Sequence, residues 1–158
     1  MLIFGVFAIR PGVDSIALDR QGKWLYFAPV TDDQLHRIRV SDLNDATLND
    51  EELEAKVESF ADKTMSDGIT MDNSGNIYLS DLEHSAITRL SSDGTLNTLI
   101  KDTKLRWPDG FSFGPEGYLY VTASSLQHVI AKPASYIAQK GPYQIFRLKT
   151  DKTAMPGH

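Results

Sequence analysis

Residues 66–81, SDGITMDNSGNIYLSD, combine an acidic head at Asp67, an alternating apolar run, a tight turn at Gly75 and a second alternating run. Apolar residues at every second position on both sides of a Gly- and Asn-rich turn are typical of a β-hairpin. This stretch therefore predicts two antiparallel strands, and the fold depends on whether the hairpin stands alone or repeats.

The same pattern occurs three times along the chain. It reads DSIALDRQGKWLYF from Asp14, DGITMDNSGNIYL from Asp67 and DGFSFGPEGYLYV from Asp109, with starts 53 and 42 residues apart. A third alternating run follows each hairpin: LHRIRV, AITRLSS and YQIFRLKT. Repeats of this length, built from three- or four-stranded antiparallel meanders, are typical of β-propeller blades. We therefore predict an all-β fold, namely a partial β-propeller of about three blades.

One segment between the first and second repeats departs from strand alternation. Asn49 and Glu52 fit a capping box. Leu53, Val57 and Phe60 recur at the spacing of one helical face. The pattern predicts a short inserted helix over about 50–59, which accounts for most of the extra length of the first repeat.

The repeats also set the expected domain boundaries. A half-propeller is predicted over 1–150, followed by a flexible tail over 151–158 because that segment has no periodicity. The apolar start of the chain, MLIFGVFAIRPG, lacks the basic region and small-residue cleavage site of a signal peptide. We expect it to form an edge strand of a blade.

Composition excludes several classes of partner and chemistry. Charged residues make up 23% of the chain and the net charge is −5, and no basic stripe of the kind that binds nucleic acid is present. There are no cysteines, so neither disulfides nor thiolate chemistry is available. No apolar run is long enough to span a membrane. We expect a small-molecule ligand rather than nucleic acid or a membrane.

The three acidic heads are the main candidate site. Asp14, Asp67 and Asp109 share one repeat position at the start of an innermost strand, so propeller symmetry brings them toward one mouth of the central channel. Converging carboxylates repel each other unless a proton or a cation compensates. Oxygen ligands suit Ca²⁺ or Mg²⁺, which makes these residues candidate metal ligands. The alternative is structural, because Asp before Gly commonly stabilises a turn through its own backbone.

Two further residues join Asp67 and Asp109 as candidate ligand-binding residues. Trp107 lies just before Asp109, where its ring either stacks on a flat ligand or packs between blades. His128 follows the second strand of the third repeat and is a candidate for lining the mouth. No Ser-His-Asp arrangement stands out, so no catalytic residue is assigned.

Three stretches resemble the major royal jelly/yellow protein family in a bacterial-type form. They are GVDSIALDRQGKWLYFAP at 12–29, SDGITMDNSGNIYLSD at 66–81 and WPDGFSFGPEGYLYVTASSLQH at 107–128. The Asp-Gly heads followed by G-x-(I/L)-Y are more loosely similar to the regucalcin/gluconolactonase propellers. Either resemblance implies a six-bladed ring, of which this chain resembles the C-terminal half.

The two resemblances imply different functions. The royal jelly/yellow resemblance implies a propeller that binds a small ligand at the channel mouth, extracellular or periplasmic in its full-length form. The gluconolactonase resemblance implies a metal-dependent lactonase or hydrolase, in which channel-mouth acids bind the metal. A three-bladed half also exposes two apolar flanks, which predicts either self-association or a missing N-terminal half.

Overall fold

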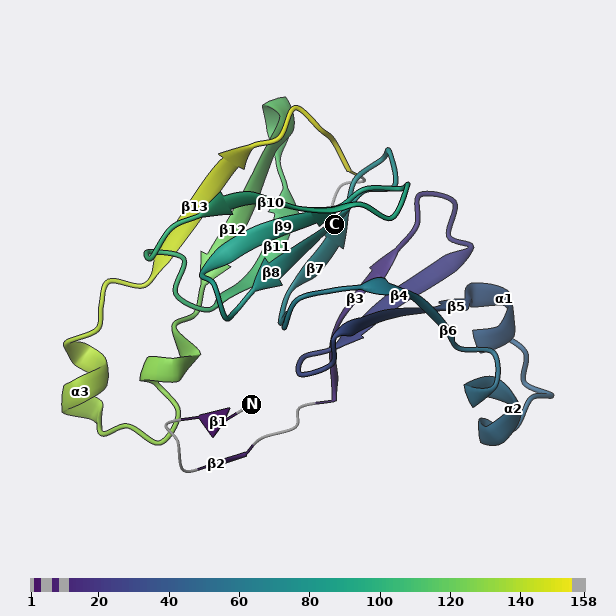
Figure 1. Cartoon of the computed structure of the whole chain (residues 1–158), viewed down its shortest axis with the longest axis horizontal. Helices are drawn as coiled ribbons and strands as arrows, with labels where there is room; N and C mark the ends of the chain where they lie inside the picture. Colours follow the sequence, from purple (N-terminus) through teal and green to yellow (C-terminus); the bar gives the residue numbers. More distant parts are fainter. Residues whose placement is uncertain (1, 4–6, 9–11, 155–158) are drawn as a thin grey trace.

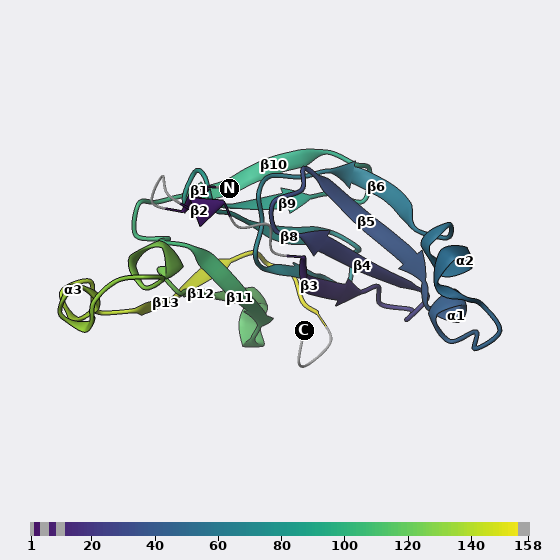
Figure 2. The ribbon, with the colours of Figure 1, turned by 90° about the horizontal axis from the view of Figure 1, so that it is seen from below.

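The computed structural model describes residues 2–3, 7–8 and 12–154, and its main feature is three antiparallel sheets arranged like blades of a fan (Figures 1 and 2). Each sheet is a meander in which consecutive strands pair along the chain. Blade 1 contains β3 (Val13–Leu18), β4 (Trp24–Pro29), β5 (Gln34–Arg39) and β6 (Glu58–Asp62). Blade 2 contains β7 (Ile69–Met71), β8 (Ile77–Asp81), β9 (Ala86–Leu90) and β10 (Leu96–Lys101). Blade 3 contains β11 (Pro108–Phe113), β12 (Tyr118–Ala123) and β13 (Gln144–Lys149).

These sheets confirm the predicted all-β, three-bladed partial propeller. The innermost strand of each blade is the first strand of its repeat, β3, β7 or β11, and β7 contacts both of the others. The heads of the three repeats therefore meet at the starts of neighbouring strands.

Short helices lie in the connections between strands. They are α1 (Val40–Leu43), α2 (Asp50–Glu54), α3 (Ala134–Ala138) and the 3₁₀ turns η1 (Pro115–Gly117) and η2 (Leu126–His128). The predicted inserted helix is α2, and its capping box between Asn49 and Glu52 is present. The helix ends before the predicted position because residues 58–62 form β6. Phe60 therefore belongs to a strand, where its ring packs edge-on against Tyr26 with centroids 5.1 Å apart.

A cross-strand pair recurs in all three blades. The tyrosine that follows the turn glycine stands opposite an arginine on the next strand, so that the aromatic ring and the guanidinium lie on the same face of the sheet. The pairs are Tyr26 with Arg37, Tyr78 with Arg89 and Tyr120 with Arg147. The three repeats of the sequence therefore also have equivalent cross-strand contacts in the structure.

Two apolar cores join the blades, one at each interface between neighbouring sheets. The core between blades 1 and 2 contains Ala17, Tyr26, Ala28, Leu35, Ile69, Met71, Ile77, Leu79 and Leu90. The core between blades 2 and 3 contains Tyr78, Ile87, Leu105, Phe113, Leu119 and Val121. Blade 2 therefore buries both of its faces, whereas blades 1 and 3 each bury one.

The chain ends are described only in part. β1 (Leu2–Ile3) pairs with β2 (Phe7–Ala8) as a separate two-stranded sheet, so the described residues of this segment are not an edge strand of a blade as predicted. The backbone carbonyl of Thr153 accepts a hydrogen bond from Asn73 N at 2.7 Å, while residues 155–158 lie outside the described part. A flexible tail over 151–158 stays a prediction. Among the described residues, no helix is long and apolar enough to cross a membrane.

Candidate active site

Asp67 lies in the connection that leads into β7, and its residue surface is only 4% exposed. The Oγ of Ser80, on the neighbouring strand β8, accepts hydrogen bonds from the backbone N–H groups of Asp67 at 2.9 Å and Gly68 at 3.0 Å. Ser15 of blade 1 donates its hydroxyl to the Asp67 carbonyl. The backbone of Asp67 is therefore held by its own blade and by the preceding one.

Gly68 explains why a glycine follows this acid. A Cβ atom built at Gly68 would lie 1.6 Å from the backbone carbonyl oxygen of Asp109 and 3.0 Å from a ring carbon of Phe111. No side chain fits there, because the innermost strand of blade 3 passes directly over this position. The Asp-Gly head of blade 2 thus permits a close contact between blades.

Trp107 connects blade 3 to the acid of blade 2. Its indole Nε1 donates a hydrogen bond to Oδ2 of Asp67 at 2.5 Å. Its backbone has a φ of 54°, an unusual value for a bulky residue, and Ser124 donates both its N–H and its hydroxyl to the Trp107 carbonyl. The tryptophan was predicted either to stack on a ligand or to pack between blades, and the structure adds a polar contact with the carboxylate.

The three acidic heads form one electrostatic cluster, which we call the acidic cluster (Asp14, Asp67 and Asp109). Burial raises the pKa of Asp67 to about 7, and a hydrogen bond with Asp14 and the negative charges of Asp109 and Asp14 add to the rise. The bond from Trp107 opposes it. Burial and the charge of Asp14 also raise the pKa of Asp109, against a hydrogen bond with Ser124. Asp14 and Asp109 therefore lie near enough to Asp67 to raise its pKa, as expected for like charges, while a role of the three heads as ligands stays a prediction.

His128 does not take part in this cluster. Its Nδ1 lies 3.1 Å from the hydroxyl of Tyr136, on the connection that contains α3. Burial lowers the pKa of His128, and the positive charges of Lys140, Arg106 and Lys132 lower it further. The electrostatic surroundings of His128 are thus basic, unlike those of the acidic cluster, and a ligand-binding role for it stays a prediction.

Comparison with known proteins identifies the family. The model of the SMP-30/gluconolactonase/LRE-like region matches residues 12–125, which contain all three acidic heads. The chain belongs to the SMP-30/gluconolactonase/LRE-like family. No curated protein sequence matches it.

Solved structures of this type share the fold of the chain. Regucalcin from Agrobacterium tumefaciens, described as a calcium-binding protein, superposes with a TM-score of 0.63 and 22% identity over 91% of this chain and 48% of its own. A gluconolactonase from Xanthomonas campestris gives a TM-score of 0.63 with 14% identity over 92% and 46%. A luciferin-regenerating enzyme gives 0.61 with 16% identity over 92% and 47%. The chain spans about half the length of each.

Membership of the SMP-30/gluconolactonase/LRE-like family raises the question of a metal, because the regucalcin neighbour binds calcium. Within the part of the chain that the structure describes, no group of three or more His, Asp or Glu side chains has the arrangement of a metal site. The donor chemistry of the acidic cluster does suit a hard divalent cation, since its donors are all carboxylate oxygens whose negative charges raise the pKa of Asp67. Ca²⁺ takes roughly six to eight oxygen ligands, so the three carboxylates supply only part of such a shell.

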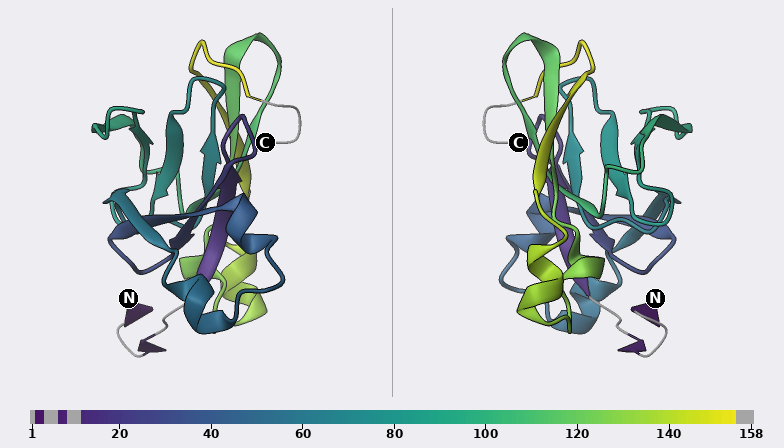
Figure 3. Two further views of the ribbon diagram at one scale, coloured as in Figure 1. Left: turned by 90° about the vertical axis from the view of Figure 1, so that its right-hand side faces the viewer. Right: turned by 90° about the vertical axis from the view of Figure 1, so that its left-hand side faces the viewer.

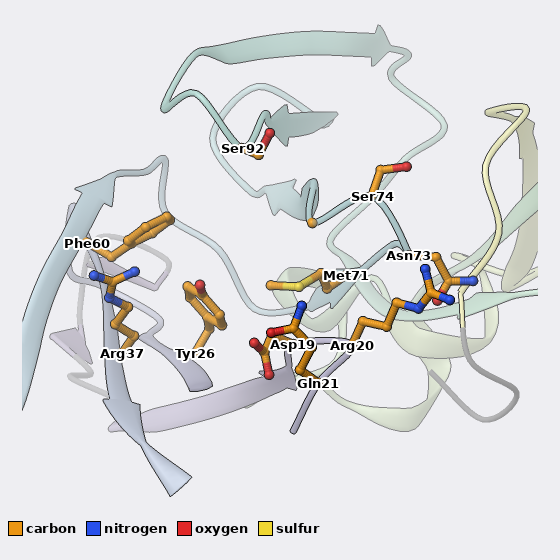
Figure 4. A pocket seen from close by; sticks show the side chains of 11 residues that line it. Asp19, Arg20, Gln21, Tyr26, Arg37, Phe60, Met71, Asn73, Ser74 and Ser92 are labelled. Carbon is orange, nitrogen blue, oxygen red and sulfur yellow. The ribbon is translucent and has the colours of Figure 1, made fainter. Parts of the chain in front are cut away.

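A polar cavity of about 380 Å³ lies between blades 1 and 2, at the opposite ends of the innermost strands (Figure 4). It is formed by Asp19, Arg20, Gln21, Tyr26, Arg37, Phe60, Met71, Asn73, Ser74, Gly75 and Ser92. The Arg37 side chain already pairs with Glu58 at 2.8 Å. The cavity shares no residue with the acidic cluster and is therefore a separate feature of the blade 1–blade 2 interface.

Two hydroxyl groups that were not among the predicted site residues hold the Asp-Gly heads of blades 2 and 3. Ser80 follows Asp67 by thirteen residues, and Thr122 follows Asp109 by the same number. Thr122 Oγ1 accepts the N–H of Gly110 at 2.9 Å, as Ser80 accepts that of Gly68. The aligned repeats contain this signal, because both positions carry a hydroxyl at a fixed distance from the head.

Proposed function

We propose that this chain forms part of a metal-dependent hydrolase of the gluconolactonase type, acting on a cyclic ester at the acidic cluster. The observation that carries the proposal is the meeting of three carboxylates at the starts of adjacent innermost strands, with the pKa of Asp67 raised to about 7. The family, and the gluconolactonase and calcium-binding regucalcin among the structural neighbours, support this reading.

In this scheme Asp67 would serve both as a cation ligand and as the acceptor of a proton from water, and its pKa in the cation-free chain suits the second role. With a pKa near 7, its carboxylate accepts a proton at neutral pH more readily than an ordinary aspartate, which is the property required of a general base. The Trp107 N–H holds Oδ2, and the hydrogen bond with Asp14 also engages the Asp67 carboxyl, so a substrate water would share or displace the Asp14 contact. In lactone hydrolysis water adds to the carbonyl carbon while the base takes a proton from that water; the ring C–O bond then breaks, and the base returns the proton to the departing ring oxygen, which becomes a hydroxyl group.

The other two acids, Asp14 and Asp109, would contribute negative charge for holding a cation and would not transfer a proton. Asp14 and Asp109, with Asp67, would hold Ca²⁺ or Mg²⁺, and such a cation supplies Lewis-acid polarisation of the ester carbonyl when bound. Ser124 orients both Trp107 and Asp109, which lie on one side of the cluster. This division of roles makes cation affinity and activity depend on the same three carboxylates.

Calorimetric titration with Ca²⁺ and Mg²⁺ tests the proposal without relying on turnover. We expect binding to the wild-type chain and loss of binding in Asp67→Asn and Asp109→Asn. The matched control is Asp93→Asn, because Asp93 lies in the turn between β9 and β10, where its side chain accepts the N–H of Thr95 within the same turn. A second assay follows hydrolysis of glucono-δ-lactone with and without chelator. Absence of cation binding, or binding unaffected by both cluster variants, would falsify the proposed site.

Small-ligand binding of the royal jelly/yellow type, which the resemblance in the sequence favoured first, becomes the second candidate function. The half-buried ring of Trp107 beside Asp67 is the feature that favours it, since an aromatic face next to a carboxylate suits an aromatic amine. Thermal shifts with catechols and amines that persist in chelator, and that disappear in Trp107→Leu, would support this alternative over the hydrolase.

A further inference from the structure

The outer face of blade 1 is an exposed apolar surface, which we call the blade 1 flank. It forms a groove of about 410 Å³ lined by Val13, Ile16, Leu25, Phe27, Ile38, Leu43, Asp50, Leu53, Glu54 and Val57. Ile16 is 60% exposed, although it lies at the centre of strand β3. Figure 3 views the chain from this side and from the opposite side. A surface this apolar points to a partner.

The repeat shows what normally covers this face. Ile16 and Leu18 hold the positions of Ile69 and Met71 in the second repeat, and those two residues are each only 7% exposed because blade 1 packs on them. Phe113, at the position of Leu18 in the third repeat, is buried against blade 2. The blade 1 flank therefore has the composition of a face that a preceding blade covers.

The face of blade 3 that points away from blade 2 is also unpaired, and we call it the blade 3 flank. It borders a groove of about 620 Å³ lined by Thr122, Ala123, Ser124, Leu126, Val129, Ile137, Tyr143, Gln144 and Ile145. Ile145, on strand β13, is 72% exposed. Tyr120 lies in the adjacent strand at the position held by Tyr78 in blade 2. The blade 3 flank therefore corresponds to the face with which blade 2 covers its neighbour.

One contact defines how successive blades fit. The ring of Tyr78 packs edge-on against Phe113 of the following blade, with centroids 5.3 Å apart. Tyr26 shares a buried cluster with Met71, the residue of blade 2 that matches Phe113. The tyrosines of blades 1 and 2 thus pack on the same repeat position of the following blade. The equivalent partner for Tyr120 would be the residue at the Leu18 position, and Leu18 itself is exposed on the blade 1 flank.

The two flanks also differ in charge. Asp50 and Glu54 line the groove of the blade 1 flank. Strand β13 of the blade 3 flank carries the exposed side chains of Arg147 and Lys149, the second of which also pairs with Asp151 at 3.3 Å. An acidic border on one flank and a basic border on the other favour contact between unlike flanks and oppose contact between like ones.

We propose that two copies of this chain pair head to tail, the blade 3 flank of each covering the blade 1 flank of the other, so that Tyr120 contacts Leu18 of the second copy. Two copies related by a twofold axis supply two identical interfaces and close the ring. Two copies together would match about the full length of one neighbouring structure, because one copy covers 48% of the regucalcin chain and 46% of the gluconolactonase chain. This inference does not rest on the proposed function.

Solution mass is the first test. Light scattering over a range of micromolar concentrations should give a mass near twice 17.6 kDa. Ile16→Glu and Ile145→Glu alter opposite flanks at exposed positions, and each should reduce the mass to that of one chain. The matched control is Ile100→Glu, because Ile100 is 38% exposed on β10 of blade 2, away from both flanks. Circular dichroism checks that all three variants remain folded.

Cross-linking tests the orientation of the pair. Because the chain has no cysteine, Leu18→Cys and Tyr120→Cys each introduce a single thiol. Oxidation of an equimolar mixture should give a disulfide-linked pair, whereas each variant alone should give much less. A single-chain mass at all concentrations would overturn the proposal. So would a dimer that survives either flank variant, or efficient cross-linking of Leu18→Cys with itself.

Discussion

The indole Nε1 of Trp107 donates a hydrogen bond to Oδ2 of Asp67 over 2.5 Å, so a residue at the entrance to blade 3 orients the acid at the entrance to blade 2. The bond also stabilises the charged form of an acid whose burial favours the neutral form. Trp107 is therefore a positioning residue for the acidic cluster, and it makes this contact from a backbone conformation with a φ of 54°.

Replacement of Trp107 by Phe should raise the pKa of Asp67 above about 7. The variant keeps an aromatic ring and removes the donor that lowers this pKa. Carboxyl-carbon NMR of the titrating aspartates measures the shift directly. Trp24→Phe is the control, because Trp24 lies on blade 1 between Arg37 and Arg39. An unchanged Asp67 midpoint in Trp107→Phe would show that the bond does not act on the acid.

Asp67→Asn should stabilise the cation-free chain at pH 8 and have little effect near pH 4. The folded-state pKa of about 7 is above the ordinary value, so between about pH 4 and 7 the folded state binds more protons than the unfolded state and stability falls as pH rises. Asn cannot ionise and avoids this loss, on the order of 1–2 kcal/mol after solvent screening.

Urea unfolding in chelator at several pH values measures that difference. Asp93→Asn is an informative control because hydrogen bonds from Thr95 lower the pKa of Asp93, so this variant should change stability in the opposite direction at neutral pH. A gap between Asp67→Asn and the wild type that does not vary with pH would contradict the expected titration.

Gly68→Ala should weaken the contact between blades 2 and 3. The added Cβ would lie 1.6 Å from the Asp109 carbonyl oxygen, so the innermost strands must separate, at a cost of about 1–3 kcal/mol or more. Gly12→Ala is the control, because a Cβ at Gly12 meets nothing within 4 Å. Thermal unfolding compares the two variants, and equal melting temperatures would argue against the close approach.

Ser80→Ala should destabilise the chain by about 1–3 kcal/mol. The buried Ser80 hydroxyl accepts the N–H groups of Asp67 and Gly68, and its removal leaves both donors without that partner. Ser80→Thr should keep most of the stability, because Thr122 performs the same task in blade 3. Denaturant unfolding of both variants tests this, and a Thr variant as unstable as the Ala variant would refute a role for the hydroxyl.

The candidate site was only partly predictable. Asp14, Asp67 and Asp109 were found because a repeat places equivalent residues at equivalent positions in space. His128 belongs to the connection after β12, which has no counterpart in the other repeats, and the structure places it beside Tyr136. The end of α2 was placed too late because the apolar spacing of Leu53, Val57 and Phe60 also suits a helix followed by a strand.

The amino-acid sequence by itself determined the blades. The alternation of apolar residues, the turn glycines and the repeated Asp–Gly–Tyr spacing each specify strands and turns over short stretches of chain, so they need no distant partner. Only the tertiary structure decided how the blades meet. The bond from Trp107 to Asp67 and the passage of Asp109 over Gly68 join residues about forty positions apart. Their geometry depends on the packing of whole sheets, which no local pattern encodes.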